Sequence, residues 1–196
     1  MAASKTRNIL VDVARQLFAR KGLESTTMND IALASGKGRR TLYTYFKNKE
    51  DVYSAVIESE LERLTNNMME VAERNTPPEE KVLSLIYTHL DQIKETVIRN
   101  GNLRAEFFRN IWLVERVRKK FDLSEIRIFR RVFKEGVLKG VFSIENVDLI
   151  ADVAHYCIKG LEVPYICGRF SGGLTSQTSE PIVARFISKA LGKTKV

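Results

Sequence analysis

The chain has 196 residues, of which 44% are hydrophobic, and its net charge at pH 7 is +8. No apolar run reaches the roughly 20 residues needed to span a bilayer, and the polar N-terminus MAASKTRN lacks the hydrophobic segment of a secretory signal. We therefore exclude a membrane protein and expect a cytoplasmic one. Its four prolines and eleven glycines, among many helix-forming residues, favour an all-α fold with one large or two small cores.

The positive charge is concentrated at the N-terminus. Residues 1–50 contain ten basic and four acidic residues, so they carry a net charge of +6 and leave only +2 for the rest. A basic segment joined to a nearly neutral body is typical of proteins that bind polyanions. A basic face that is merely solvated is the alternative, and charge alone leaves it open.

Apolar residues recur at three- and four-residue intervals in the N-terminal third, which predicts four helices. These cover residues 6–21, 27–35 and 39–46, followed by a long helix from Asn48 to the Pro77-Pro78 stop. Gly22 is expected to end the first helix in a left-handed conformation. Thr27 and Asp30 have the spacing of a capping box, and Asn48 with Asp51 is expected to cap the long helix.

Five more helices are predicted in the remainder of the chain. They cover residues 79–99, 102–111, 113–138, 143–166 and 180–191. The periodicity of the third of these is interrupted near residues 122–124, and Ser143 is expected to cap the fourth. Strand-like alternation does not occur at useful length, so the predicted fold class is all-α.

The stretch SGKGRRTLYTYF, residues 35–46, admits two interpretations. A nucleotide-binding phosphate loop requires GxxxxGK[ST] after a buried strand, and the glycines here are two residues apart and follow a helix. A helix-turn-helix motif explains more of the stretch. The glycines would form the turn, Arg39 and Arg40 would begin the recognition helix, and Leu42 and Phe46 would point into the core.

Residues 9–53 resemble the N-terminal domain of TetR/AcrR-family transcriptional regulators. The shared features are A..LF...G...T, then IA...G, and then TLY.YF..KE, with matching spacing. The resemblance implies a three-helix helix-turn-helix head over residues 1–48. It also implies a helical effector-binding and dimerisation body over residues 49–196.

The resemblance also assigns DNA contacts. Thr27, Tyr43, Tyr45 and Lys49 match family positions that contact the phosphate backbone. The turn departs from the family pattern, because Lys37 replaces an apolar residue, Gly38 a serine cap and Arg40 a small residue. The predicted DNA-binding residues are Thr27, Lys37, Arg39, Arg40, Thr41, Tyr43, Tyr45 and Lys49.

The body is predicted to hold an effector pocket and a dimer interface. The candidate pocket residues are Met68, Tyr87, Phe107, Phe108, Trp112 and Phe121. The candidate interface residues are Ile150, Ala154, Ile158, Leu161, Ile182 and Phe186, with intrachain core as the alternative. His89 and His155 have no carboxylate or cysteine partner at a suggestive spacing. We therefore expect them at the surface, and we expect no catalytic residues, metal site or cofactor.

Taken together, these patterns and the family resemblance predict a homodimeric transcriptional regulator and no enzyme. We expect a repressor that binds a near-palindromic operator in double-stranded DNA and is released by a small apolar or amphipathic effector of unknown identity. The alternatives are an activator without small-molecule release and a helical adaptor that binds another protein. An all-α enzyme is disfavoured because the sequence has no nucleophile–base pair and no cofactor motif.

Overall fold

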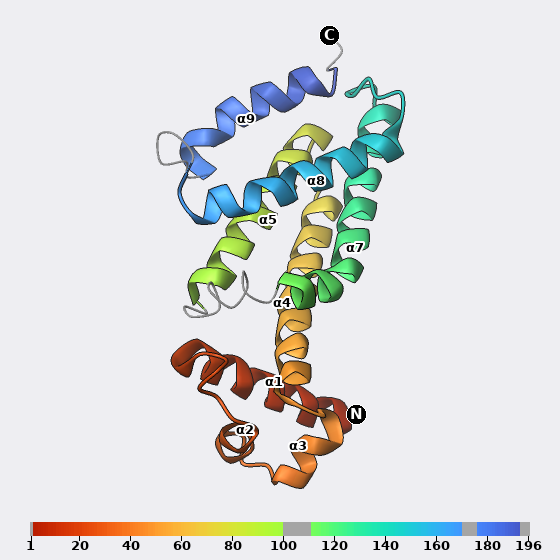
Figure 1. The fold of residues 1–196 in the computed structure, drawn as a ribbon. Helices are drawn as coiled ribbons and strands as arrows, with labels where there is room; N and C mark the ends of the chain where they lie inside the picture. The colour runs from red at the N-terminus through yellow and green to blue at the C-terminus, as the bar shows by residue number, and fades with distance from the viewer. Residues whose placement is uncertain (1, 100–110, 170–175, 193–196) are drawn as a thin grey trace. The chain divides into compact units, whose positions relative to one another are not determined.

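The computed structural model describes residues 2–99, 111–169 and 176–192 (Figure 1). Within these ranges every regular element is an α-helix, which confirms the all-α prediction. The helices are α1 (Ala2–Lys21), α2 (Met28–Ala34), α3 (Arg39–Tyr45), α4 (Lys49–Glu73), α5 (Pro78–Arg99), α7 (Ile111–Leu138), α8 (Val147–Ile166) and α9 (Ser176–Ala190). The helix expected over residues 102–111 falls almost wholly outside the described residues. None of the described helices is long and apolar enough to cross a membrane.

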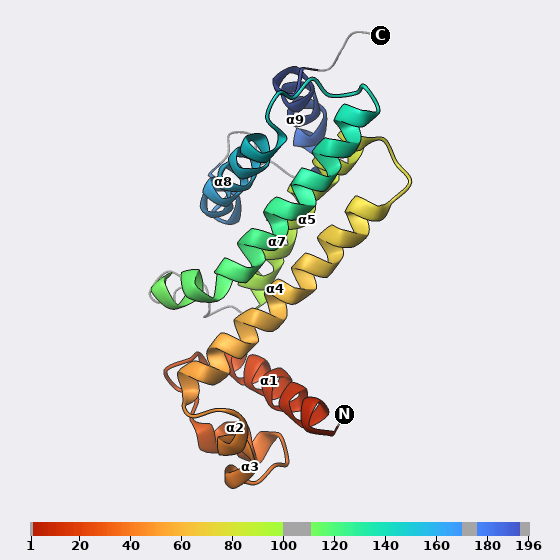
Figure 2. The same cartoon turned by 90° about the vertical axis from the view of Figure 1, so that its right-hand side faces the viewer.

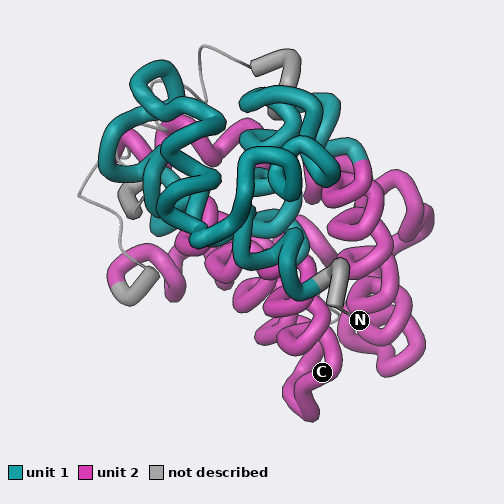
Figure 3. Tube along the Cα trace, turned by 90° about the horizontal axis from the view of Figure 1, so that it is seen from below, with its two compact units in different colours: residues 1–62, 95–119 teal, residues 63–94, 120–196 magenta. Residues whose placement is uncertain are grey.

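The chain divides into two compact units (Figure 3). Unit 1 comprises residues 1–62 and 95–119, and unit 2 comprises residues 63–94 and 120–196. The division falls within α4, α5 and α7. The functional boundary expected between residues 48 and 49 is a different division of the chain, and it stays a prediction.

Unit 1 has a core formed by α1, α2, α3 and the first turns of α4 (Figure 2). Its most deeply buried apolar residues are Leu10, Ala14, Phe18, Ile31, Leu42, Val52, Tyr53 and Val56. The rings of Phe18 and Tyr53 meet edge to face with centroids 6.0 Å apart, which is a favourable aromatic arrangement. Gly22 has φ of 82°, and its N–H donates to the Phe18 carbonyl at 2.9 Å. Gly22 therefore ends α1 in the predicted left-handed conformation.

Side-chain caps begin the helices that frame this core. The Thr27 hydroxyl accepts a hydrogen bond from the Asp30 N–H at 3.1 Å, and the Asp30 carboxylate accepts one from the Thr27 N–H at 2.9 Å. This is the predicted capping box. At α4 the Asn48 side chain accepts from the Asp51 N–H at 2.8 Å, and the Asp51 carboxylate accepts from the Lys47 N–H at 3.0 Å. Both predicted caps are confirmed.

In unit 2, α8 crosses α5 and α7, to which its side chains are hydrogen-bonded (Figures 1 and 2). The helix predicted over residues 113–138 is confirmed as α7, which runs unbroken through residues 122–124 despite the interrupted apolar periodicity there. The structure corrects one prediction: α8 is capped by Asn146, which accepts from the Leu149 N–H at 3.0 Å, and not by Ser143. The Ser143 N–H instead donates to the Leu191 carbonyl at 3.1 Å, so this residue joins the end of α9.

Candidate nucleic-acid interface and helical body

Four residues separate α2 from α3 and form a tight turn. The Gly36 N–H donates to the Leu33 carbonyl and the Lys37 N–H to the Ala32 carbonyl, each at 3.1 Å. Gly36 has φ of +63°, a left-handed conformation that glycine adopts without a Cβ clash. Gly38 then serves as the N-cap of α3 without a side-chain hydrogen bond. Two short helices joined in this way form a helix-turn-helix motif.

The two faces of α3 differ in chemistry. Leu42 is fully buried and Phe46, which follows the helix, is 4% exposed, so both anchor α3 to the core as predicted. Arg39 and Arg40 are exposed in its first turn, and Tyr43 is 45% exposed in its second. Thr41, Tyr45 and Lys37 are half-buried. The solvent-facing side of α3 is therefore basic and hydroxyl-bearing.

Two of the residues expected to contact phosphate also have structural roles. The Thr27 hydroxyl donates to the Asp30 carboxylate at 2.9 Å in addition to its capping bond. The Lys49 ammonium donates to the Leu23 carbonyl at 2.8 Å and the Glu24 carbonyl at 3.1 Å. Lys49 thus ties the start of α4 to the loop after α1, which sequence reasoning missed because these contacts span about 25 residues. The DNA contacts of Thr27 and Lys49 stay predictions.

The candidate pocket residues that the structure describes are buried in unit 2. Met68 is fully buried, Phe121 is 3% exposed and Tyr87 is 9% exposed. The Tyr87 hydroxyl shares a hydrogen bond of 2.5 Å with that of Ser179 on α9. The other candidates, Phe107, Phe108 and the side chain of Trp112, lie outside the described residues. The role of all six in effector binding stays a prediction.

A buried network of histidines and carboxylates joins α5, α7 and α8. His89 Nδ1 lies 2.5 Å from Glu125 Oε1, and His89 Nε2 lies 2.8 Å from Glu162 Oε1. His155 Nδ1 lies 2.5 Å from the other oxygen, Glu125 Oε2. His89 and Glu125 are fully buried and His155 is 1% exposed, so the prediction that both histidines lie at the surface is wrong. Their partners stand 30 to 73 residues away, so no local spacing could reveal them.

The network holds paired charges in the interior. Burial lowers the pKa of His89, but the Glu125 charge and the hydrogen bonds to Glu125 and Glu162 outweigh this effect and raise it to about 9. Burial alone would raise the pKa of Glu125. The His89 charge and the hydrogen bonds to both imidazoles outweigh this effect, so the net result is a lowered pKa. Among the described residues no group of histidine, cysteine and carboxylate side chains has the arrangement of a metal site. We interpret the network as an ionic clamp between helices.

The pKa of His89 gives the fold a specific pH dependence. Because the folded-state value lies above the ordinary 6.5, the stabilisation is fully present below pH 6.5 and is lost as the pH rises through 9. We expect the free energy of unfolding in urea to fall by on the order of 3 kcal/mol across this interval. In the control His89→Gln this contribution should disappear. An equal fall in both proteins would contradict the assignment to His89.

The apolar surface of α8 differs from the predicted one. Ile158 is 3% exposed and Ile150 and Ala154 are half-buried, so Ile158 belongs to the core of this chain and is removed from the interface candidates. The exposed apolar residues of α8 are Leu149, Val153, Tyr156, Leu161 and Val163. On α9 the candidates Ile182 and Phe186 are 69% and 72% exposed. The sequence could not separate these faces because apolar residues surround most of α8.

Comparison with known proteins relates both parts of the chain to transcriptional regulators. Residues 10–56 match the family model described as bacterial regulatory proteins, tetR family. The transcriptional repressor KstR2 of Mycolicibacterium smegmatis is 28% identical over 151 residues, which cover 74% of this chain and 71% of that protein. A TetR/AcrR-family regulator from Thermobifida fusca has a TM-score of 0.66 at 25% identity, covering 93% of this chain and 96% of that one. The regulator FadR from Bacillus subtilis, solved with stearoyl-CoA, has a TM-score of 0.65 at 18% identity, covering 92% and 96%.

The helix-turn-helix motif, the basic outer face of α3 and the all-helical body define a DNA-binding transcriptional regulator. The family model assigns its N-terminal segment, residues 10–56, to the TetR family of these regulators.

Proposed function

We propose that the protein is a homodimeric transcriptional repressor that acts in the cytoplasm and leaves its operator when a small effector binds. The two-faced helix α3 carries this proposal. Its buried face fixes the helix to the head, and its exposed face offers Arg39 and Arg40 to base edges in the major groove. Tyr43 and Thr41 would contact the DNA backbone. Thr27 and Lys49, whose side chains also make hydrogen bonds within the head, would contact it as well. Lys37, in the turn, would approach a phosphate.

Titration of the purified protein against a duplex from its own promoter region tests the DNA-binding role. The logarithm of the affinity should fall steeply and linearly with the logarithm of the salt concentration, because lysine and arginine release counterions from the phosphates. An unrelated duplex of equal length should bind about 1000-fold more weakly. Equal affinity for both duplexes, or affinity that is insensitive to salt, would argue against a sequence-specific regulator.

Dimerisation is proposed through the exposed apolar faces of α8 and α9. An unpartnered apolar surface of this kind marks an interaction site, and a twofold dimer would present two copies of α3 about one helical turn of DNA apart, roughly 34–36 Å. The interface we propose uses Leu149, Val153 and Tyr156 on α8 with Ile182 and Phe186 on α9.

We expect Phe186→Glu to give a monomer, because it would bury a charge at the centre of the proposed interface. Light scattering after size-exclusion chromatography should change from twice the 22.4 kDa of one chain to that mass alone. The control Leu138→Glu alters an apolar side chain on α7 that is 87% exposed, and it should leave the dimer intact. A dimer that survives Phe186→Glu, or dissociates equally in both variants, would refute this interface.

The effector is proposed to bind in the helical body. The neighbour FadR was solved in complex with stearoyl-CoA, an amphipathic molecule, which supports an effector of this kind. Two observations support a route from the body to the head. Residues 95–119 belong to the same compact unit as the head. Within that unit Glu60 on α4 accepts from Arg15 of α1 at 3.2 Å and from Thr96 of α5 at 3.5 Å. A displacement of α5 would therefore be transmitted to α1 through the Glu60 carboxylate, which is 8% exposed.

A further inference from the structure

The positive charge of the body is concentrated on one helix. Helix α7, Ile111–Leu138, contains eight basic and four acidic residues, a net charge of +4. Residues 51–196 together carry only +2, so the rest of the body is net negative. A helix that opposes the charge of its surroundings in this way is a candidate site for an anion.

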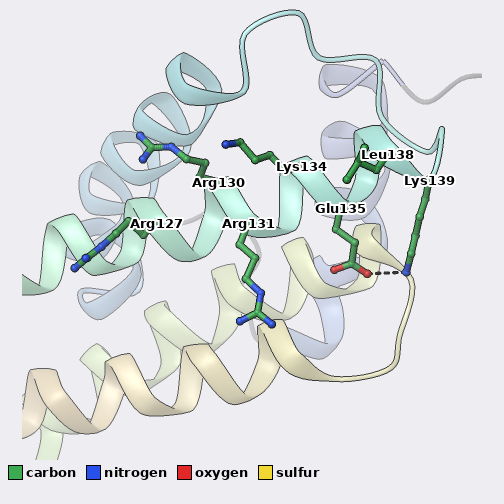
Figure 4. Close-up of a pocket in the computed structure, with 7 residues that line it drawn as sticks. All are labelled: Arg127, Arg130, Arg131, Lys134, Glu135, Leu138 and Lys139. Atoms are coloured by element: carbon green, nitrogen blue, oxygen red, sulfur yellow. Dashed lines mark hydrogen bonds and ion pairs between the residues drawn. The ribbon is translucent and has the colours of Figure 1, made fainter.

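The basic residues of α7 line a surface groove with a volume of about 500 Å³ (Figure 4). Arg130 and Lys134 leave the helix on one side, and Arg131 leaves it on the other. The complete lining is Arg127, Arg130, Arg131, Lys134, Glu135, Leu138 and Lys139. Five cationic side chains and one carboxylate therefore line this surface, and Arg130 and Arg131 extend to opposite sides of the helix.

The existing ion pairs compensate this charge only in part. Arg130 lies 2.5 Å from Asp148 and Arg131 lies 3.2 Å from Glu73, but the two acids are 69% and 55% exposed. Ion pairs at such exposure contribute little stability, so a ligand could replace them at small cost. Lys134 is exposed and makes no ion pair or hydrogen bond with any residue that the structure describes. The groove thus holds both free and easily released cations.

We propose that this groove binds a small molecule bearing two or more phosphate groups, of which a nucleoside triphosphate is the simplest representative. Residues at positions i, i+3, i+4 and i+7 lie on one face of a helix, so Arg127, Arg130, Arg131 and Lys134 border the same surface. A compact anion bound there would draw Arg130 and Arg131 toward it from Asp148 and Glu73. The guanidinium groups of Arg130 and Arg131 match phosphate oxygens in pairs. The exposed side chain of Leu138 and the arginine stems offer apolar surface to a base. This ligand is independent of the DNA contacts proposed for α3.

The surroundings of the groove favour a compact anion over an extended one. Glu73 and Asp148 flank it, and Glu135 lies within it, where it pairs with Lys81 at 2.8 Å and Lys139 at 2.7 Å. A DNA backbone laid across the helix would meet these carboxylates and be repelled.

Isothermal titration of the full-length protein with ATP and with pyrophosphate tests the proposal, and adenosine serves as the probe without phosphate. Binding of both phosphate-bearing probes is expected. Lys134→Glu should weaken it about tenfold or more, because a charge-assisted hydrogen bond is replaced by repulsion. Lys119→Glu makes the same charge change at an exposed site on the same helix outside the groove, and it should change the affinity less than twofold. Alanine at both Arg39 and Arg40 should also leave ATP binding unchanged.

Three results would overturn the proposal. One is the absence of heat with both ATP and pyrophosphate. Another is equal weakening by Lys134→Glu and Lys119→Glu, which would mean a general response to net charge. The last concerns a duplex of unrelated sequence. If Lys134→Glu, but not Lys119→Glu, weakens its binding and ATP does not compete with it, the groove is a nucleic-acid surface.

Discussion

Replacement of both Arg39 and Arg40 with alanine is expected to reduce operator affinity by about 100-fold or more. Each bidentate arginine–guanine contact contributes about 1–3 kcal/mol of discrimination, and both side chains are exposed in the first turn of α3. Fluorescence anisotropy with a labelled operator, at one fixed salt concentration, measures the change. The ratio of operator to unrelated-duplex affinity should fall along with it, because the lost contacts are to bases.

A control separates base contacts from general charge. Alanine at Lys5 and Arg20, two exposed residues of α1, removes the same charge from the head. Its effect should be smaller and should be equal for operator and unrelated duplexes. If the Arg39 and Arg40 double variant binds its operator like the wild type, α3 does not read DNA in the proposed way. A normal circular dichroism spectrum is required of both variants.

The second large effect is expected at the ionic clamp. Glu125→Ala should destabilise the protein by about 3–5 kcal/mol, because it leaves a protonated His89 and a buried His155 without their shared acceptor. Urea unfolding at pH 7 measures the loss. Glu125→Gln keeps the side-chain volume and one acceptor, so it should fold and lose less.

Glu73→Ala provides the comparison, because it removes an acid from an ion pair of 3.2 Å between exposed side chains. Such pairs contribute about 0–1 kcal/mol, so this variant should remain close to wild-type stability. Similar small losses in Glu125→Ala and Glu73→Ala would mean that the buried network does not hold α5, α7 and α8 together.

The parts of the fold that followed from the sequence depend on local interactions. The capping box of Thr27 and Asp30, the left-handed Gly22 and the inward side chains Leu42 and Phe46 each rest on residues within four positions of one another. Short-range hydrogen bonds and helical periodicity leave direct traces in the order of residues. The helix-turn-helix motif could therefore be predicted almost residue by residue.

The rest depends on contacts between distant segments. His89 contacts Glu125 and Glu162 only because α5, α7 and α8 pack together. The residues near position 89 in the sequence do not indicate a buried charge pair. The apolar residues of α8 are spread around the helix, so periodicity could not tell the outward Val153 and Tyr156 from the inward Ile158. Ser143 and Asn146 are both good caps, and the contact of residue 143 with the end of α9 decides between them.

Selection of bound duplexes from a random-sequence pool tests the central claim most directly. A homodimer that reads DNA through α3 should enrich a near-palindromic site whose half-sites are centred about 10 base pairs, or a multiple of this, apart. The Arg39 and Arg40 double variant should lose the enriched bases while it retains weak binding. Enrichment of no sequence, or of the same sequence by wild type and variant, would contradict the account.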